Sequence, residues 1–193
     1  MKRLFIQLTL LFFCSTSIVC AQNEMPNHIK DKITYPVLDF HPWVGVIPIS
    51  NPVLSYDSSI DYKVALDLYG RVKDSTAIHP VILEVARTYN LHVENGVPAE
   101  KIQIAAVIHG GLVQAILSEE EYQKKYQTGN PNLVALKALD GVGVKFYVCG
   151  QSMGFYNLLQ EHITPLVKLA VSAKTAFVTL DQKGFTYLDV SAD

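Results

Sequence analysis

The chain has 193 residues, of which 49% are hydrophobic and 18% charged, with 11 glycines and 9 prolines. This length suits a single domain, and the composition supports a sizeable core and excludes wholesale disorder. The formal net charge is −2. Because the chain has no basic excess with which to neutralise phosphates, we do not expect it to bind nucleic acid.

The first 21 residues have the pattern of a secretory signal. Lys2 and Arg3 precede an apolar run over 4–13, and small residues then lead to Val19-Cys20-Ala21. We therefore expect cleavage between Ala21 and Gln22 and a periplasmic or secreted protein without a membrane contact. The apolar run is shorter than the roughly 20 residues of a membrane span. An uncleaved anchor and lipidation at Cys20 remain as alternatives, although Val19 is bulky for a residue before a lipidated cysteine.

Removal of this segment leaves Cys149 as the only thiol, since Cys14 and Cys20 both precede the expected cut. Lys2 and Arg3 are lost with no acidic residue, so the formal net charge changes from −2 to −4. No intramolecular disulfide is then possible. An unpaired thiol in an oxidising compartment risks oxidation, which raises the question of what Cys149 does.

Residues 22–61 are predicted to form an ordered, extended arm that precedes the α/β domain, 62–193. Five prolines break any helix there and limit any strand to a sheet edge: Pro26, Pro36, Pro42, Pro48 and Pro52. Tyr35, Phe40 and Trp43 are apolar enough to pack on the body of the protein. A surface wrap and a subunit contact are the simplest roles for this arm.

From Tyr62 onward, short apolar runs alternate with helical patterns. The spacing predicts strands at 62–69, 102–108, 144–149, 166–171 and 185–190, and helices beginning at Pro80, after Ser118, at Asn130-Pro131, over 152–161 and after Ser172. Ser118 and Glu121 have the spacing of a capping box. Continuous apolar runs such as 102–108 are typical of strands buried on both faces. The pattern therefore predicts an α/β protein with mostly parallel strands.

Two turns at strand ends form the candidate site, because ligands of open parallel sheets bind beyond the carboxyl ends of the strands. His109-Gly110-Gly111 follows one strand and Cys149-Gly150-Gln151 follows the next. His109 and Cys149 share one edge if these strands are neighbours. Cys149 would also precede a helix, where unpaired N–H groups favour a thiolate. Gly150 would let a reacting group approach the backbone closely.

Structural roles for the same residues remain open. Free cysteine is among the most buried residue types, so Cys149 can equally be an inert packed thiol. A histidine after a buried strand, such as His109, can be a hydrogen-bonded structural residue. Asp67 lies on the first strand and could point to the edge, but no second carboxylate pairs with it. Arg71 could hold an anion or remain a surface cation.

Other classes of site lack their motifs. Gly110-Gly111 could cradle a phosphate, but the chain contains neither G-x-G-x-x-G nor G-x-x-x-x-G-K-[ST]. It also lacks the H-E-x-x-H of zinc proteases. We therefore expect neither a metal nor a cofactor.

Several motifs occur in an order that resembles the DsrE/DsrF-like family. They are Ile108-His109-Gly110-Gly111, Asn130-Pro131-Asn132, Gly143-Val144, Val148-Cys149-Gly150-Gln151, Val171-Ser172-Ala173 and the set Phe177, Leu180 and Gly184-Phe185. The resemblance covers about 62–190 and is strongest for an exported branch with a Cys-Gly-Gln turn. It implies a three-layer α/β/α sandwich around a mostly parallel five-stranded sheet, assembled into trimers or hexamers.

The resemblance also implies a role for Cys149. In sulfur-relay members of the family, a cysteine after the third strand accepts a persulfide sulfur and passes it to a cysteine of a partner protein. Cys149 falls at that position, and His109 falls in the region that faces it. The residues expected to line the site are Gly110, Gly111, Gly150, Gln151 and Asn130. Relay members are cytoplasmic, so export and the arm depart from the family pattern.

Two functions follow from these observations. The first is an exported sulfur carrier, rather than a turnover enzyme, that uses Cys149 as the acceptor thiol and docks with a sulfur donor or acceptor protein. The second is a non-catalytic, oligomeric protein that binds a small ligand and in which Cys149 is structural.

Overall fold

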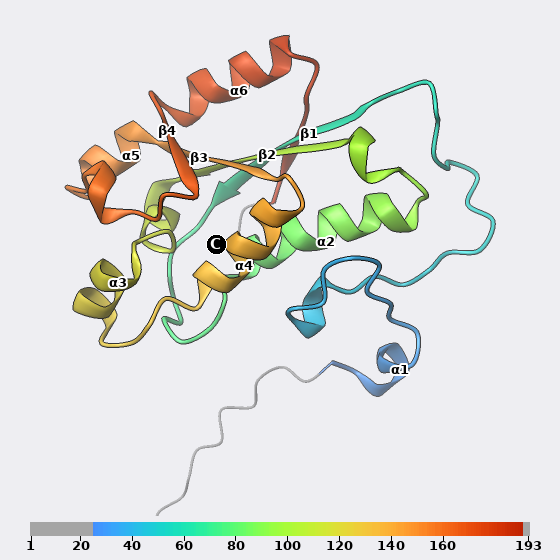
Figure 1. Ribbon diagram of the computed structural model, residues 1–193, viewed down its shortest axis with the longest axis horizontal. Helices are drawn as coiled ribbons and strands as arrows, with labels where there is room; N and C mark the ends of the chain where they lie inside the picture. The colour runs from blue at the N-terminus through green and yellow to red at the C-terminus, as the bar shows by residue number, and fades with distance from the viewer. Residues whose placement is uncertain (1–24, 191–193) are drawn as a thin grey trace, which may run out of the picture.

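A computed structural model of the protein describes residues 25–190 (Figure 1). The expected signal segment, its cleavage site, Cys14 and Cys20 lie outside these residues. In chain order the helices and strands are α1 (Asn27–Lys30), β1 (Tyr62–Tyr69), α2 (Pro80–Glu94), β2 (Ile102–His109), α3 (Glu119–Tyr126), α4 (Asn132–Gly141), β3 (Lys145–Cys149), α5 (Gly150–Phe155), β4 (Val167–Ala170), α6 (Ala173–Gln182) and β5 (Thr186–Asp189). Short 3-10 turns occupy Pro42–Val44, Ala99–Lys101, Gly110–Gln114 and Gln160–His162.

The five strands form one sheet in the order β4-β3-β2-β1-β5, and every pairing in it is parallel. Helices α2 and α4 cover one face of the sheet and α6 covers the other (Figure 1). This arrangement confirms the predicted α/β architecture. It also places β4 and β5 at the two edges and aligns the carboxyl ends of all five strands.

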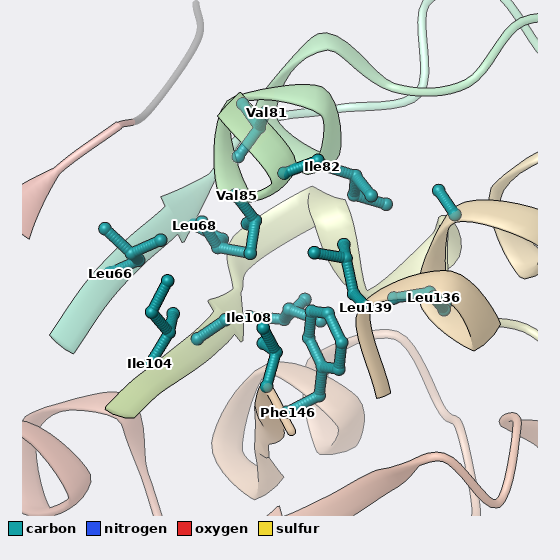
Figure 2. Packing of buried hydrophobic residues seen from close by; sticks show 14 of the residues in the cluster. Leu66, Leu68, Val81, Ile82, Val85, Ile104, Ile108, Leu136, Leu139 and Phe146 are labelled. Atoms are coloured by element: carbon teal, nitrogen blue, oxygen red, sulfur yellow. The ribbon is translucent and has the colours of Figure 1, made fainter. Parts of the chain in front are cut away.

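The larger core lies between the sheet and helices α2 and α4 (Figure 2). In β1, β2 and β3, alternation places the even-numbered side chains on this face, where they meet the apolar stripes of both helices. In β4 the odd-numbered Val167 lies on the same face. The buried residues include Leu66, Leu68, Ile104, Ile108 and Phe146 from the strands and Val81, Ile82, Val85, Leu136 and Leu139 from the helices. The odd-numbered residues of β1, β2 and β3 face α6, where small side chains such as Ala65 and Ala105 allow close packing of the helix.

Two predicted helical features are wrong. A helix over 152–161 is not formed, because α5 ends at Phe155 and Asn157 then adopts the left-handed conformation with φ 52°. The Tyr156 N–H bonds back to the carbonyls of Ser152 and Met153, which closes the last turn. Ser118 Oγ does accept from the Glu121 N–H at 3.3 Å, but the Glu121 carboxylate pairs with Lys124 instead of completing a capping box.

The arm packs along α2 and is fastened there by Asn90, a side chain with no exposed surface. Asn90 Nδ2 donates to the carbonyls of Leu38 and Val44 at 2.8 and 2.9 Å, and Oδ1 accepts from the Leu38 N–H at 3.0 Å. Thr34 and Val46 form an isolated antiparallel bridge within the arm. These contacts attach the described part of the arm, 25–61, to α2.

His79 connects three segments at the start of α2. Its Nδ1 accepts from the Val81 N–H at 3.3 Å, and its Nε2 lies 3.0 Å from the carbonyl oxygen of Arg71. Since a carbonyl only accepts, Nε2 carries the proton and the ring is neutral. The His79 backbone N–H donates to Asn132 Oδ1 at 2.8 Å, which ties α2 to α4. Burial, followed by the charge of Lys73, holds the pKa of His79 below its usual value despite the bond to Arg71.

This lowered pKa predicts a loss of stability in mild acid. As the pH falls through about 6.5, the unfolded chain takes up a proton at His79 and the folded protein does not, so unfolding is favoured. The His79→Asn variant retains a helix-capping side chain but does not titrate. We expect the wild type to lose about 1 kcal/mol more than this variant between pH 7.5 and pH 5.5, measured by urea unfolding. Equal losses in the two proteins would contradict the assignment.

Among the helices between residues 25 and 190, none is long and apolar enough to cross a membrane.

Candidate functional site

The two predicted turns lie side by side. Strands β2 and β3 pair from Ala105 with Lys145 to Ile108 with Val148, so His109 and Cys149 are the next residues on neighbouring strands. Alternation places both on the face covered by α6, where Cys149 packs with Val107 and Ala173. The structure therefore confirms that His109 and Cys149 share the carboxyl edge of the sheet.

The Cys149 sulfur lies among polar groups of the segments that follow β3 and β4. It accepts a hydrogen bond from the Ser152 N–H at 3.4 Å, and the Ser152 hydroxyl and the N–H groups of Ala173 and Gln151 lie where they stabilise a thiolate. Burial by itself raises the pKa of the Cys149 thiol, but these hydrogen bonds together outweigh it and hold the pKa below its ordinary value. The surroundings thus favour the thiolate, which is the nucleophilic form of cysteine.

The thiol lies just beneath the surface, with 5% of Cys149 exposed. Apolar side chains on the neighbouring segments are exposed to solvent. Phe155 at the end of α5 is 90% exposed, Val171 just after β4 is 74% exposed and Leu169 on β4 is 50% exposed. Leu169 and Val171 border Gly150, the residue after Cys149, so exposed apolar surface lies close to the turn that carries the thiol.

Gly150 and Gln151 fix the turn after Cys149 against the edge strand. A Cβ atom on Gly150 would lie 3.0 Å from the carbonyl oxygen of Ala170 and 3.3 Å from that of Val171. Gln151 Nε2 donates to the Val171 carbonyl at 3.4 Å. The close approach that Gly150 permits is therefore made by the backbone after β4 and not by a reacting group.

Neighbouring side chains occupy the space beside Gly110 and Gly111, which argues against a phosphate cradle. Gly110 has φ +61°, and a Cβ atom there would overlap the Tyr69 ring. A Cβ atom on Gly111 would lie 2.8 Å from Arg71 Cγ. The Gly110 N–H donates to Ser152 Oγ at 2.9 Å, so the first turn is bonded to the second through the same hydroxyl that contacts Cys149.

Asn130 is not part of this site. Its Nδ2 donates to the carbonyls of Ala115 and Leu117 at 3.1 and 2.7 Å, and its Oδ1 accepts from the Asn132 backbone and side chain. Asn130 is 6% exposed. These bonds tie the segment after β2 to the start of α4, so its role in the fold is structural.

The structure adds three side chains that the sequence did not assign to the site. Asp67 Oδ1 lies 2.6 Å from His109 Nε2, and Tyr187 donates to Asp67 Oδ2 at 2.6 Å. Ser152 connects Gly110 to Cys149. A serine three residues after a cysteine that starts a helix has capping spacing, which was a readable signal for Ser152. No comparable local signal indicates that Asp67 contacts His109, which is 42 positions later in the sequence, or Tyr187, which is 120 positions later.

The part of the chain that the structure describes contains no group of three or more His, Cys, Asp or Glu side chains that could hold a metal ion.

Comparison with known proteins identifies the family of this chain. A family model described as the DsrE/DsrF-like family matches residues 66–190. No curated protein matches the chain. The chain is similar to a solved structure titled as the protein of unknown function MTH1491 from Methanobacterium thermoautotrophicum, with 19% identity and a TM-score of 0.49. That alignment covers 67% of this chain and 99% of the other. Since the family match spans well over half of the sequence, the protein belongs to the DsrE/DsrF-like family.

Proposed function

We propose that this protein is an exported carrier of sulfane sulfur and that Cys149 is the thiol that accepts it. The observation that carries the proposal is the place of Cys149 at the carboxyl edge of the sheet, where its sulfur accepts from the Ser152 N–H at 3.4 Å and nearby donors hold its pKa below the ordinary value. Membership of a family with sulfur-relay members is consistent with this role. Export is inferred from the signal pattern of the first 21 residues.

The same donors suit both halves of a carrier's cycle. As nucleophile, the Cys149 thiolate attacks the sulfane sulfur of a donor and forms a persulfide. In the second half, an acceptor thiolate attacks the outer sulfur and Cys149 leaves as a thiolate. A lower thiol pKa makes Cys149 a better leaving group, and hydrogen bonds to its sulfur stabilise that product.

The alternative function is that of a non-catalytic protein that binds a small ligand. The burial of Cys149, 5% exposed and packed on Val107 and Ala173, favours this alternative. In that case the thiol is a core residue, and it should react slowly with any reagent at neutral pH.

Intact-mass spectrometry distinguishes the two functions. After incubation of the mature protein with inorganic polysulfide, we expect added mass equal to one or more sulfur atoms, removed by a reductant. The Cys149→Ser variant, which preserves a small polar side chain, should gain none. Sulfur loading on this variant, or none on the wild type, would contradict the carrier role. The same spectrum tests cleavage after Ala21.

Docking of a partner is part of the proposal. The exposed apolar side chains of Phe155 on α5 and of Leu169 and Val171 near Gly150 suit contact with another protein surface. We also propose that the protein is a homo-oligomer, either a trimer or a hexamer. A monomeric molar mass measured in solution by light scattering would contradict this.

A further inference from the structure

His109 is held in place by a chain of contacts across three neighbouring strands. Its Nε2 lies 2.6 Å from Asp67 Oδ1, and the other carboxylate oxygen of Asp67 accepts from the Tyr187 hydroxyl at 2.6 Å. The Tyr69 ring packs on the imidazole with 5.1 Å between ring centroids. Both the plane of the His109 ring and the position of its Nε2 are thereby restrained.

These contacts determine which nitrogen of His109 carries the proton. A carboxylate only accepts hydrogen bonds, so a neutral His109 holds its proton on Nε2 and leaves Nδ1 as the acceptor. The hydrogen bond to Asp67, followed by burial and the charges of Asp67 and Asp189, raises the pKa of Tyr187 to about 12. Tyr187 therefore remains a donor over the physiological pH range and keeps Asp67 oriented toward His109.

In the register of the sheet, Cys149 is the nucleophilic side chain nearest to His109. His109 follows the printed pair of Ile108 with Val148 by one residue, as Cys149 does, and both side chains extend the α6 face. Among residues 25–190, His109 Nδ1 makes no hydrogen bond, including none to the Cys149 sulfur in this resting arrangement. Catalytic hydrogen bonds are often incomplete before substrate binds, so the register is the informative observation.

We propose that Asp67 and Tyr187 are positioning residues that hold His109 as the proton acceptor for the Cys149 thiol. The inference rests on the proposed function of Cys149 and names the proton path that this function needs. The other titratable groups around His109 are Tyr69 on β1, Arg71 and Tyr156 beside Gly111, and Asp189 beside Tyr187. Helix α6 contributes the apolar ring of Phe177, which packs on Tyr187.

The transfer step balances with a persulfide donor, R–S–SH. His109 Nδ1 takes the proton of Cys149, and the resulting thiolate attacks the terminal sulfur of the donor. A new S–S bond forms to Cys149, the donor S–S bond breaks, and R–S⁻ leaves with the electron pair. The imidazolium, stabilised by Asp67, returns its proton to R–S⁻. The products are Cys149–S–SH and R–SH, with no net oxidation or reduction.

The rate of Cys149 alkylation by iodoacetamide as a function of pH tests the inference. Because the negative charge of Asp67 stabilises the imidazolium that forms when His109 takes the thiol proton, the Asp67→Asn variant should leave less Cys149 thiolate at neutral pH. We expect alkylation at pH 7 to be about ten-fold slower than in the wild type. Tyr187→Phe should slow the reaction about two- to three-fold, because the charge of Asp67 remains. Asp181→Asn, which removes an exposed carboxylate from α6, is the control.

An Asp67→Asn profile that coincides with that of Asp181→Asn would overturn the inference. Should Asp67→Asn fail to fold, the ¹⁵N chemical shifts of His109 in the wild-type protein give a second test, since a proton on Nδ1 would contradict the assigned tautomer. Neither measurement uses a sulfur donor. If the rate of Cys149 alkylation depends on Asp67 but Cys149 gains no sulfur, only the carrier function is contradicted. If Cys149 gains sulfur but its alkylation rate does not depend on Asp67, only the role of His109 is contradicted.

Discussion

Replacing Asn90 with alanine is expected to lower the free energy of unfolding by about 2–4 kcal/mol and to detach the arm from α2. Asn90 makes three hydrogen bonds to buried backbone groups of Leu38 and Val44. An alanine leaves those groups without partners, and each unsatisfied buried group costs about 1–3 kcal/mol. Water that reaches the released arm recovers part of this loss, so the total stays below the sum of the three bonds.

Urea unfolding measures the loss of stability, and limited proteolysis within residues 25–61 reports whether the arm has left α2. Arg87→Ala is the matched control, because Arg87 lies on the same helix and its exposed pair with Glu84 contributes little. Alkylation of Cys149 should not change in Asn90→Ala, since the arm packs on α2 and Cys149 faces α6. An Asn90→Ala protein within about 0.5 kcal/mol of the wild type, with an intact arm, would show that other contacts hold the arm.

The strands and most helices could be predicted because their signals are local. Apolar runs such as Ile102–Ile108 and capping residues such as Ser172 depend on neighbours within a few positions, and the structure places both as predicted. The helix predicted over 152–161 failed for a related reason. Its polar and aromatic residues gave no clear apolar stripe, and nothing in the pattern indicated the left-handed Asn157 at which the chain turns.

The candidate site was only half predictable. The turns carrying His109 and Cys149 could be located because parallel strands end at a common edge. The partners of His109 could not be, since Asp67 and Tyr187 reach it only through the strand order β2-β1-β5. Periodicity does not determine strand order. For Asn130 the error is the opposite one. Asn130 lies in a motif that resembles the family and was expected to line the site, but its side chain is occupied in holding two backbone segments together.

Replacing Ser152 with alanine is expected to raise the pKa of Cys149 toward its ordinary value and to slow alkylation at pH 7 about three- to ten-fold. The variant removes the hydroxyl that donates to the Cys149 sulfur, while the N–H groups of residues 151, 152 and 173 remain. The effect is therefore partial. The Gly110 N–H also loses its acceptor, which should cost about 1 kcal/mol of stability.

The pH dependence of alkylation separates these two consequences of the Ser152 change. Ser152→Thr keeps a hydroxyl and should retain most of the reactivity. Ser118→Ala, which removes the serine that caps α3, is a control for the loss of a serine hydroxyl that accepts a backbone hydrogen bond elsewhere in the fold. A Ser152→Ala protein that is less stable but has an unchanged alkylation profile would limit Ser152 to a structural role. The ¹⁵N shifts of His109 should not change in Ser152→Ala, because Asp67 and Tyr187 are untouched. Hydrogen bonding to the thiolate and removal of its proton can thus be measured as separate contributions to the reactivity of Cys149.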